Sequence, residues 1–194
     1  MMLKNPHTAI FSGMTGCGKT KLFLNLIESH YNNHFDYIVV FCPTIKNNLS
    51  YGRNWIWNDD YVILFCVFDN FEDTLRDLRS WLSGCEVLFV LDDMICEKSL
   101  DKRRTETLKL AVSGRHDRHY LWILTQVYNA VPKDLRRQAK VVYLWYPKER
   151  GEFKSVMDEN NVVDEKDFLN VFNRLKDGSC LCLNMEDKKY YFVR

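Results

Sequence analysis

The chain reads Phe11-Ser12-Gly13-Met14-Thr15-Gly16-Cys17-Gly18-Lys19-Thr20 near its amino end. From Gly13 to Thr20 this stretch matches the pattern G-x-x-x-x-G-K-[ST]. A short apolar strand is predicted just before it, over Thr8–Ser12, and a helix is predicted over Lys19–His30. The pattern therefore occurs in the strand–loop–helix context of a phosphate-binding loop, and it indicates a site for a nucleoside triphosphate.

Each residue type in this loop suits phosphate binding. The glycines let the backbone curl, so that its N–H groups point toward a β-phosphate, and the helix that begins near Gly18 adds the positive end of its dipole. Lys19 is predicted to bridge the β- and γ-phosphates, and the Thr20 hydroxyl to bind Mg²⁺. The loop does not distinguish ATP from GTP. The predicted nucleotide-binding residues are Gly13, Met14, Thr15, Gly16, Cys17, Gly18, Lys19 and Thr20.

A second, acidic motif follows the most hydrophobic strand of the chain, which is predicted over Val87–Leu91. This strand leads directly into Asp92-Asp93. In P-loop folds the first acid at this place holds Mg²⁺ through water, and the next residue acts as a base or orients the attacking water. We therefore predict that Asp92 is a metal residue and that Asp93 is the catalytic base.

A polar residue and a basic loop flank the next predicted strand, Tyr120–Thr125. Gln126 follows the carboxyl end of this strand, where a side chain can contact the γ-phosphate or its water, and we predict that it is a sensor. Arg115 and Arg118 precede the same strand and so lie at its opposite end. They are candidates for an arginine finger that reaches the nucleotide of a neighbouring subunit, with solvated loop charges as the alternative.

The rest of the chain alternates apolar strands with helices. Nearly continuous apolar strands are typical of a parallel sheet covered by helices on both faces. We therefore predict an α/β fold with a single P-loop domain over residues 1–194, a β-hairpin at the carboxyl end and an irregular stretch over residues 44–60. The further strands are predicted over Tyr37–Cys42, Tyr61–Val67, Val141–Trp145, Cys180–Asn184 and Lys189–Val193, and the further helices over Asp69–Leu82, Leu100–Val112 and Lys166–Leu175.

The composition excludes several other classes of protein. The chain has 194 residues, of which 46% are hydrophobic and 14% aromatic, so it is not expected to be disordered. Its net charge of +1 excludes a polycation. Its apolar runs are far shorter than the about 18 residues of a membrane span, and no secretory signal is expected. Seven scattered cysteines indicate a reduced, intracellular protein without disulfides or zinc. Cys180 and Cys182 are predicted to share one face of a strand, and His116 and His119 to be plain loop histidines.

Two clusters of basic residues offer local contacts to a polyanion, with solvated helix faces as the alternative. Neither cluster carries a base-reading motif, which suits contact that is independent of sequence. Trp55 and Trp57 are expected to pack within the chain or against a neighbouring subunit, with stacking on bases as the alternative. The first cluster contains Lys98, Lys102, Arg103, Arg104 and Lys109, and the second contains Lys133, Arg136, Arg137, Lys140, Lys148 and Arg150.

The motifs, taken in order, resemble those of the genome-packaging ATPases of the FtsK–HerA superfamily. They are most similar to its poxvirus-type branch, which is shared with giant viruses, virophages and Maverick/Polinton elements. After the two nucleotide motifs, the most specific part of the resemblance is Ser113-Gly114-Arg115-His116, then Leu124-Thr125-Gln126-Val127-Tyr128, then Val131-Pro132-Lys133-Asp134-Leu135-Arg136. The resemblance covers the chain from Thr8 to Tyr146 and, more loosely, the terminal hairpin.

This resemblance implies an additional-strand (ASCE) P-loop fold with a mostly parallel central sheet of order 5-1-4-3-2. It implies that ATP hydrolysis, with Mg²⁺, drives double-stranded DNA into a capsid through a homo-oligomeric ring. Capsid proteins are further implied partners, and no membrane partner is expected. The implied location is the infected host cell, either in its cytoplasm or in a virus factory, or else the vertex of the virion. The implied roles are phosphate and Mg²⁺ binding for Lys19 and Thr20, metal binding for Asp92, sensing for Gln126 and a trans-acting finger for Arg115.

One departure and three alternative functions remain at this point. The wider superfamily has Asp-Glu where this chain has Asp92-Asp93, and the shorter side chain either brings the water closer or weakens the base. A nucleotide switch or assembly protein would bind nucleotide without hydrolysis that DNA stimulates. A helicase or plasmid-transfer ATPase of the same superfamily would carry an added module, and a small-molecule kinase would carry a lid and a base-specific pocket.

Overall fold

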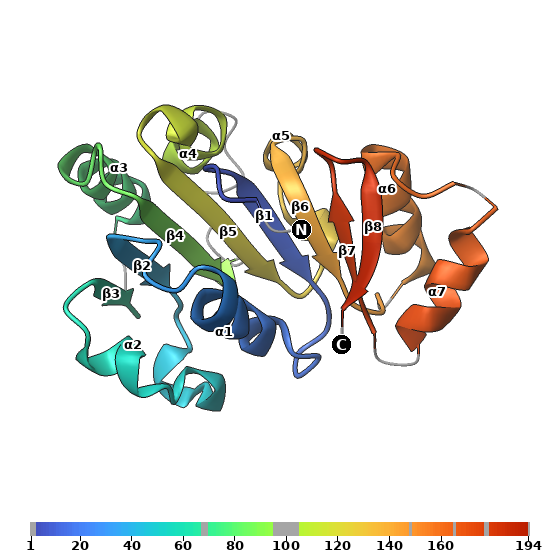
Figure 1. Cartoon of the computed structure of the whole chain (residues 1–194), viewed down its shortest axis with the longest axis horizontal. Coiled ribbons are helices and arrows are strands. Elements are labelled where there is room, and N and C mark those ends of the chain that lie inside the picture. The colour runs from blue at the N-terminus through green and yellow to red at the C-terminus, as the bar shows by residue number, and fades with distance from the viewer. Residues whose placement is uncertain are drawn as a thin grey trace.

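Eight strands of the computed structural model form one sheet in the order β3-β2-β4-β5-β1-β6-β7-β8 (Figure 1). Strands β1 to β6 pair in parallel, whereas β7 and β8 join the sheet antiparallel. The structure describes residues 3–66, 70–94, 105–147, 149–164, 166–176 and 179–193. The strands are β1 (Thr8–Ser12), β2 (Tyr37–Phe41), β3 (Val62–Phe65), β4 (Val87–Asp92), β5 (His119–Thr125), β6 (Ala139–Leu144), β7 (Cys180–Asn184) and β8 (Lys189–Val193).

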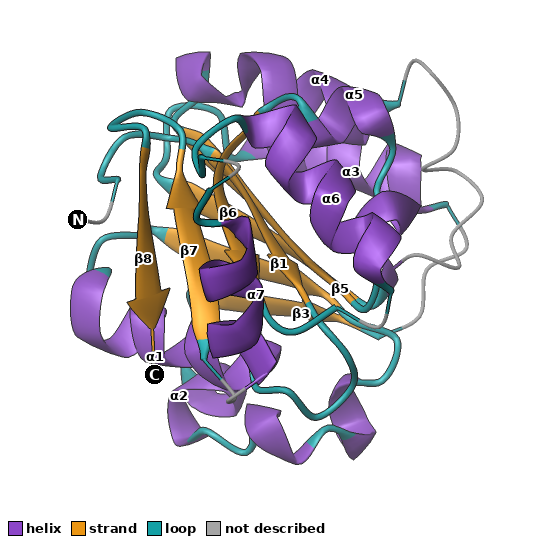
Figure 2. Cartoon of the chain, turned by 90° about the vertical axis from the view of Figure 1, so that its right-hand side faces the viewer, coloured by secondary structure: helices purple, strands orange, loops and turns teal. Residues whose placement is uncertain are grey.

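Helices cover both faces of this sheet (Figure 2). Helices α1 and α2 contribute apolar side chains to the core on one face, and α3 to α7 contribute to the core on the other. This is the layered α/β arrangement that the apolar strands predicted. The helices are α1 (Lys19–His30), α2 (Asn54–Asn58), α3 (Phe71–Trp81), α4 (Glu106–Ser113), α5 (Lys133–Arg136), α6 (Arg150–Asn160) and α7 (Phe168–Lys176).

Strand β4 is apolar from Val87 to Leu91 because it is buried on both sides. Phe89 and Leu91 point into the core beneath α3 to α6, and Leu88 and Val90 point into the core beneath α1. Alternate residues of a strand face opposite sides, so two cores require a continuous apolar run. The two cores together hold the strand in place, and Asp92 at its end is held with it.

The observed strand order differs from the predicted order 5-1-4-3-2. That order accounts for five strands, whereas the observed sheet has eight, with β1 between β5 and β6. The sheet is extended by β3 beyond β2 at one edge, and by β7 and β8 beyond β6 at the other. An apolar strand buries its backbone N–H and C=O groups, which need hydrogen-bond partners, so these further strands join the edges of the existing sheet. The predicted hairpin at Cys180–Asn184 and Lys189–Val193 is confirmed.

Three helices were not predicted: the short α2 and α5, and α6 with 11 residues. Helix α2 lies within residues 44–60, which we expected to be irregular. Helix α6 buries Phe153, Val156 and Met157. These three positions have helical spacing, but they make too short a pattern to indicate a helix by themselves.

The helix predicted over Leu100–Val112 begins at Glu106, so its predicted start was wrong: Thr105 has extended backbone angles and precedes the first turn. The hydroxyl of Thr105 caps it by accepting a hydrogen bond from the backbone N–H of Leu108 at 3.1 Å. Residues 95–104 lie outside the described part of the chain.

From the composition we expected no membrane span and no disulfide bonds. Within the described ranges, no helix combines the length and apolar character that a bilayer crossing demands. The six cysteines that the structure describes are free. Cys180 and Cys182 both lie in the core beneath α1, which confirms that they share one face of β7.

Candidate nucleotide-binding site

The glycine-rich loop connects β1 to α1 at the carboxyl edge of the parallel strands (Figure 1). Gly16 and Gly18 have φ angles of 77° and 106°. Glycine adopts this left-handed region without the steric penalty of a Cβ atom. Gly18 is the residue immediately before α1, so the loop turns directly into the first turn of the helix. The strand–loop–helix arrangement predicted for residues 8–30 is confirmed.

Gly13 is needed at the start of the loop because other atoms come very close to it. A Cβ atom at this position would lie 2.7 Å from the Cβ of Trp145 and 2.8 Å from the Sγ of Cys17. The backbone N–H of Gly13 donates to the carbonyl oxygen of Thr125 at 3.2 Å. The loop therefore starts tightly packed between the ends of β5 and β6.

The side chain of Lys19 folds back over the loop. Its Nζ donates hydrogen bonds to the carbonyl oxygens of Gly13 at 2.6 Å and of Met14 at 3.1 Å. The residue is only 7% exposed. No carboxylate in the described part of the chain forms a salt bridge with this ammonium group, so its charge is available to an anion in the loop.

Asp92 brings three separate segments of the chain together. Its Oδ2 accepts hydrogen bonds from the Tyr51 hydroxyl at 2.7 Å and from the Thr20 hydroxyl at 3.4 Å. Burial raises the pKa of Asp92 to about 6, and the nearby charge of Asp93 adds to this rise. The hydrogen bond from Tyr51 and the positive charge of Lys19 oppose the rise. A carboxylate in this state is stabilised by a cation placed beside it.

Sequence reasoning missed two residues that contact Asp92. Tyr51 ends a 3₁₀ turn over Leu49–Tyr51 and is 1% exposed, and burial raises its pKa so that its hydroxyl stays protonated. The Sγ of Cys42 lies 3.9 Å from Asp92 Oδ2, and burial raises the pKa of this thiol to about 11. Neither residue belongs to a motif, and the irregular pattern of residues 44–60 carries no signal that would have found Tyr51.

Asp93 and Gln126 lie next to each other at the same edge of the sheet. The Nε2 of Gln126 is 3.5 Å from the Oδ1 of Asp93. Asp93 has a φ of 55°, and its backbone N–H donates to the carbonyl oxygen of Leu124 at 3.1 Å. Because β4 and β5 are neighbours, the residues that follow them leave the sheet side by side. The structure thus brings together the two residues that we predicted to hold the attacking water.

Arg115 and Arg118 lie at the opposite end of β5, as predicted. Arg118 is already engaged, since its Nη2 lies 2.8 Å from Glu86 Oε1 in a salt bridge. Arg115 is exposed on the 3₁₀ turn Gly114–His116 and forms no salt bridge with any residue that the structure describes. Of the two arginines, Arg115 is therefore the one whose charge is free to contact another molecule.

His116 lies on this turn, as predicted for a loop histidine, whereas His119 is the buried first residue of β5, so the prediction that it lies in a loop was wrong. His116 is exposed, and the buried His119 places its Nε2 3.1 Å from the carbonyl oxygen of Leu82. Within the described ranges, no group of three or more His, Cys, Asp or Glu side chains is arranged around a metal site. Mg²⁺ needs fewer protein ligands, because it binds one or two oxygens and keeps waters and phosphate oxygens. The Thr20 hydroxyl and the buried Asp92 carboxylate suit that requirement.

Glu152 is a further residue that sequence reasoning missed. It lies in α6, is 4% exposed, and its Oε1 accepts hydrogen bonds from the Ser12 hydroxyl at 3.2 Å and from the backbone N–H of Tyr128. Ser12 ends β1 just before the phosphate loop, and Tyr128 follows the β5 strand that precedes Gln126. This buried carboxylate therefore ties together the chain segments on either side of the site.

Glu152→Ala should reduce the free energy of unfolding by about 2–4 kcal/mol, because it leaves a buried hydroxyl and a buried N–H without an acceptor. Glu152→Gln keeps the accepting oxygen and should reduce the free energy of unfolding by about 1 kcal/mol. Urea unfolding at neutral pH measures both values. Equal losses in the two variants would contradict the idea that these hydrogen bonds cause the effect.

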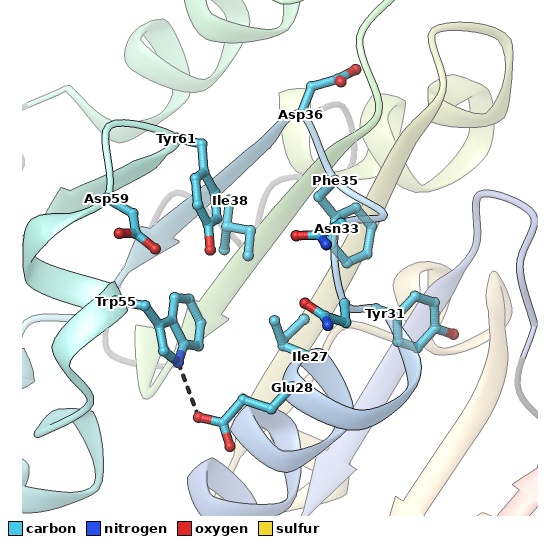
Figure 3. A pocket seen from close by; sticks show the side chains of 11 residues that line it. Ile27, Glu28, Tyr31, Asn33, Phe35, Asp36, Ile38, Trp55, Asp59 and Tyr61 are labelled. Atoms are coloured by element: carbon cyan, nitrogen blue, oxygen red, sulfur yellow. Dashed lines mark hydrogen bonds between the residues drawn. The ribbon is translucent and has the colours of Figure 1, made fainter.

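The two tryptophans of residues 44–60 form hydrogen bonds within the chain, although the side chain of Trp57 is exposed. The Nε1 of Trp55 donates to Glu28 Oε1 at 3.0 Å, which fastens this segment to α1 (Figure 3), and the Nε1 of Trp57 donates to the carbonyl oxygen of Tyr51 at 2.8 Å. Figure 3 also shows Trp55 on one wall of a hollow of about 480 Å³, opposite Phe35. This hollow opens at the amino end of β2 and is separate from the phosphate loop.

Only part of the two basic clusters can be placed. Arg136 is occupied, because it pairs with Glu159 at 2.9 Å and stacks 4.9 Å from the centre of the Tyr128 ring. Lys109 and Arg137 are exposed; Lys109 pairs with Glu106 of its own helix α4, and Arg137, which follows α5, pairs with Asp134 of that helix. Lys133 and Lys140 are exposed. The residues that lie outside the described part of the chain are Lys98, Lys102, Arg103, Arg104 and Lys148, together with the side chain of Arg150.

Comparisons with known proteins agree with this geometry. The family described as "Poxvirus A32 protein" matches residues 1–184. A sequence search of curated proteins finds no match.

Three solved structures share the fold at low sequence identity. The first is the genome packaging NTPase B204 from Sulfolobus turreted icosahedral virus 2 in complex with AMPPCP, with a TM-score of 0.72, 14% identity and coverage of 100% of this chain and 99% of that one. The second is B204, the DNA-packaging ATPase from Sulfolobus turreted icosahedral virus (0.68, 14%, 98% of both chains). The third is the pCW3 conjugation coupling protein TcpA with ATPγS (0.63, 14%, 98% of this chain and 61% of that one).

Proposed function

Because the chain belongs to the Poxvirus A32 protein family, we propose that it is an ATP-driven motor that moves double-stranded viral DNA into a capsid. The observation that carries this proposal is the convergence of Lys19, Thr20 and Asp92 at one edge of the sheet. Packaging ATPases with the same fold, one of them holding an ATP analogue, support it.

In the proposed site the triphosphate lies against the backbone N–H groups of residues 13–20 and the first turn of α1. Lys19 exchanges the carbonyl oxygens of Gly13 and Met14 for the β- and γ-phosphates. Thr20 and Asp92 are the residues that would hold Mg²⁺, and Asp92 would do so through water. Mg²⁺, when bound, neutralises phosphate charge.

Asp93 and Gln126 act on the water in this proposal. Gln126 orients it, and the Asp93 carboxylate takes its proton as the oxygen attacks the γ-phosphorus and the bond to the leaving ADP oxygen breaks. The 3.5 Å separation of these two side chains lets one water contact both. This placement supports Asp93 as the base, although the wider superfamily has the longer Glu at its position.

The proposed assembly is a homo-oligomeric ring of single-domain subunits, residues 1–194, that contact DNA independently of its sequence. Arg115 is exposed and lies at the end of β5 opposite to its own nucleotide site, so it suits the role of a finger that acts on a neighbour. Exposed basic residues such as Lys133 and Lys140 suit phosphate contacts. Capsid proteins are proposed as further partners, and the proposed place of action is the infected host cell, in the cytoplasm or virus factory, or the virion vertex.

The rate of ATP hydrolysis is expected to rise more than linearly with protein concentration, because a shared site forms only between subunits. Long double-stranded DNA should raise the rate further. Short duplexes at the same total concentration of base pairs should raise it less, since a translocating ring leaves them quickly. The measurement is phosphate release over a range of protein concentrations, with each DNA and with none.

A rate that is linear in protein concentration and indifferent to DNA would contradict the motor. Tight nucleotide binding with slow hydrolysis under those conditions would point to a switch or assembly protein. Phosphate transfer to a nucleoside by a monomer would point to a kinase. Strand separation of a duplex would point to a helicase of the same superfamily.

A further inference from the structure

Among the side chains that the structure describes, Tyr51 makes the shortest hydrogen bond to the Asp92 carboxylate, although no motif contains it. Its hydroxyl lies 2.7 Å from Asp92 Oδ2, whereas the Thr20 hydroxyl lies at 3.4 Å and the Cys42 sulfur at 3.9 Å. Tyr51 is 1% exposed, so water is excluded from the bond. A buried hydrogen bond to a carboxylate is charge-assisted and directional, and it restricts the rotation of that carboxylate.

The bond makes the two oxygens of Asp92 unequal. Oδ2 accepts from Tyr51, whereas Oδ1 accepts no hydrogen bond from any residue in the described ranges. Resting on the metal role proposed above for Asp92, we infer that Tyr51 is a positioning residue for Mg²⁺. Its hydroxyl holds the carboxylate in one orientation, so that Asp92 would lose little rotational freedom on holding the metal through water.

The segment that carries Tyr51 is itself braced. The indole of Trp57 donates to the carbonyl oxygen of Tyr51 at 2.8 Å, and the indole of Trp55 donates to Glu28 of α1 at 3.0 Å (Figure 3). Helix α1 also carries Thr20. The segment 44–60 therefore connects the helix that bears one metal residue with the strand that bears the other, and Tyr51 is the point where it touches the site.

Tyr51→Phe removes the hydroxyl and keeps the ring. We expect this change to weaken the binding of a fluorescent ATP analogue about 10-fold in the presence of Mg²⁺, in line with residues that orient metal ligands in other proteins. In EDTA the affinity should stay within about twofold of the unchanged chain, because the loop and Lys19 still hold the phosphates. The measurement is equilibrium fluorescence anisotropy under both conditions, which requires no hydrolysis.

Two further variants separate positioning from general destabilisation. Tyr31→Phe removes another buried hydroxyl, which donates to the carbonyl oxygen of Leu3 at 2.6 Å, away from the site. It should leave the ratio of the affinity in Mg²⁺ to the affinity in EDTA unchanged. Trp57→Phe removes the hydrogen bond from the indole to the carbonyl oxygen of Tyr51. It should lower the ratio of the affinity in Mg²⁺ to the affinity in EDTA, as Tyr51→Phe does, but by less.

Equal weakening by Tyr51→Phe in Mg²⁺ and in EDTA would overturn the inference, and so would no weakening at all. If the unchanged chain bound nucleotide no better with Mg²⁺ than in EDTA, the metal role of Asp92 and this inference would fail together. Mg²⁺-dependent binding that needs Tyr51, combined with hydrolysis that ignores DNA, would instead overturn only the motor.

Discussion

Lys19→Ala is expected to lower the rate of ATP hydrolysis by about 100-fold or more, the scale on which removing one preorganised charge stabiliser acts. The ammonium group is buried, is held by the carbonyl oxygens of Gly13 and Met14, and has no carboxylate partner in the described part of the chain. It therefore contributes its full charge to bound phosphates. Alanine removes that charge, so ATP binding should weaken as well.

The matched control for this prediction is Lys189→Ala. Lys189 is an exposed lysine of the edge strand β8, so its loss changes the net charge equally without touching the phosphate loop. Hydrolysis and ATP affinity should both stay close to those of the unchanged chain. Thermal unfolding of both variants without nucleotide should differ little from the unchanged chain. A rate of ATP hydrolysis by Lys19→Ala within a few-fold of the rate of Lys189→Ala would contradict the assignment of residues 13–20 as the phosphate-binding loop.

Local patterns predicted the part of the fold that carries the site. The contiguous run Gly13–Thr20 lies where the pattern placed it, and the apolar strand before Asp92 is buried on both faces, as its composition indicated. The edges of the sheet were less predictable. The strand order depends on which apolar segments pair with the edge strands of the sheet, and this pairing joins residues that are distant in sequence. The predicted five-strand order did not define the pairing of β3, β7 and β8.

The site residues that sequence reasoning missed are linked by contacts that are distant in sequence. Tyr51 reaches Asp92 across 41 residues, and Glu152 reaches Ser12 across 140. Neither residue lies in a recurring pattern, because a tyrosine in an irregular segment and a glutamate in a weakly apolar helix are common. Their roles follow from packing alone. Patterns therefore found the groups proposed to touch the nucleotide, and the structure was needed to find those that hold them.

Arg115→Ala is expected to reduce hydrolysis by the assembled protein by about 100-fold or more, because a finger arginine stabilises the charge of the transferring phosphoryl group. Arg115 cannot serve its own site, since β5 separates it from the loop edge by seven residues, and a strand of that length spans roughly 20 Å. ATP binding by isolated subunits should be unchanged. Arg118→Ala, which removes an arginine already paired with Glu86, should keep most of the activity.

Mixing two inactive variants tests whether the finger acts between subunits. An Arg115→Ala subunit retains an intact phosphate loop, and a Lys19→Ala subunit retains an intact finger. When the variants are mixed in equal amounts in a head-to-tail ring, about one quarter of the interfaces pair an intact loop with an intact finger. Phosphate release should therefore recover well above the level of either variant alone.

A mixture that stays inactive although the subunits co-assemble would mean that Arg115 acts within its own chain or that one incomplete interface stops the whole ring. In that case, a small fraction of Arg115→Ala subunits mixed into rings of unchanged subunits distinguishes the two explanations. If one incomplete interface stops the whole ring, activity falls far more steeply than the fraction of Arg115→Ala subunits rises.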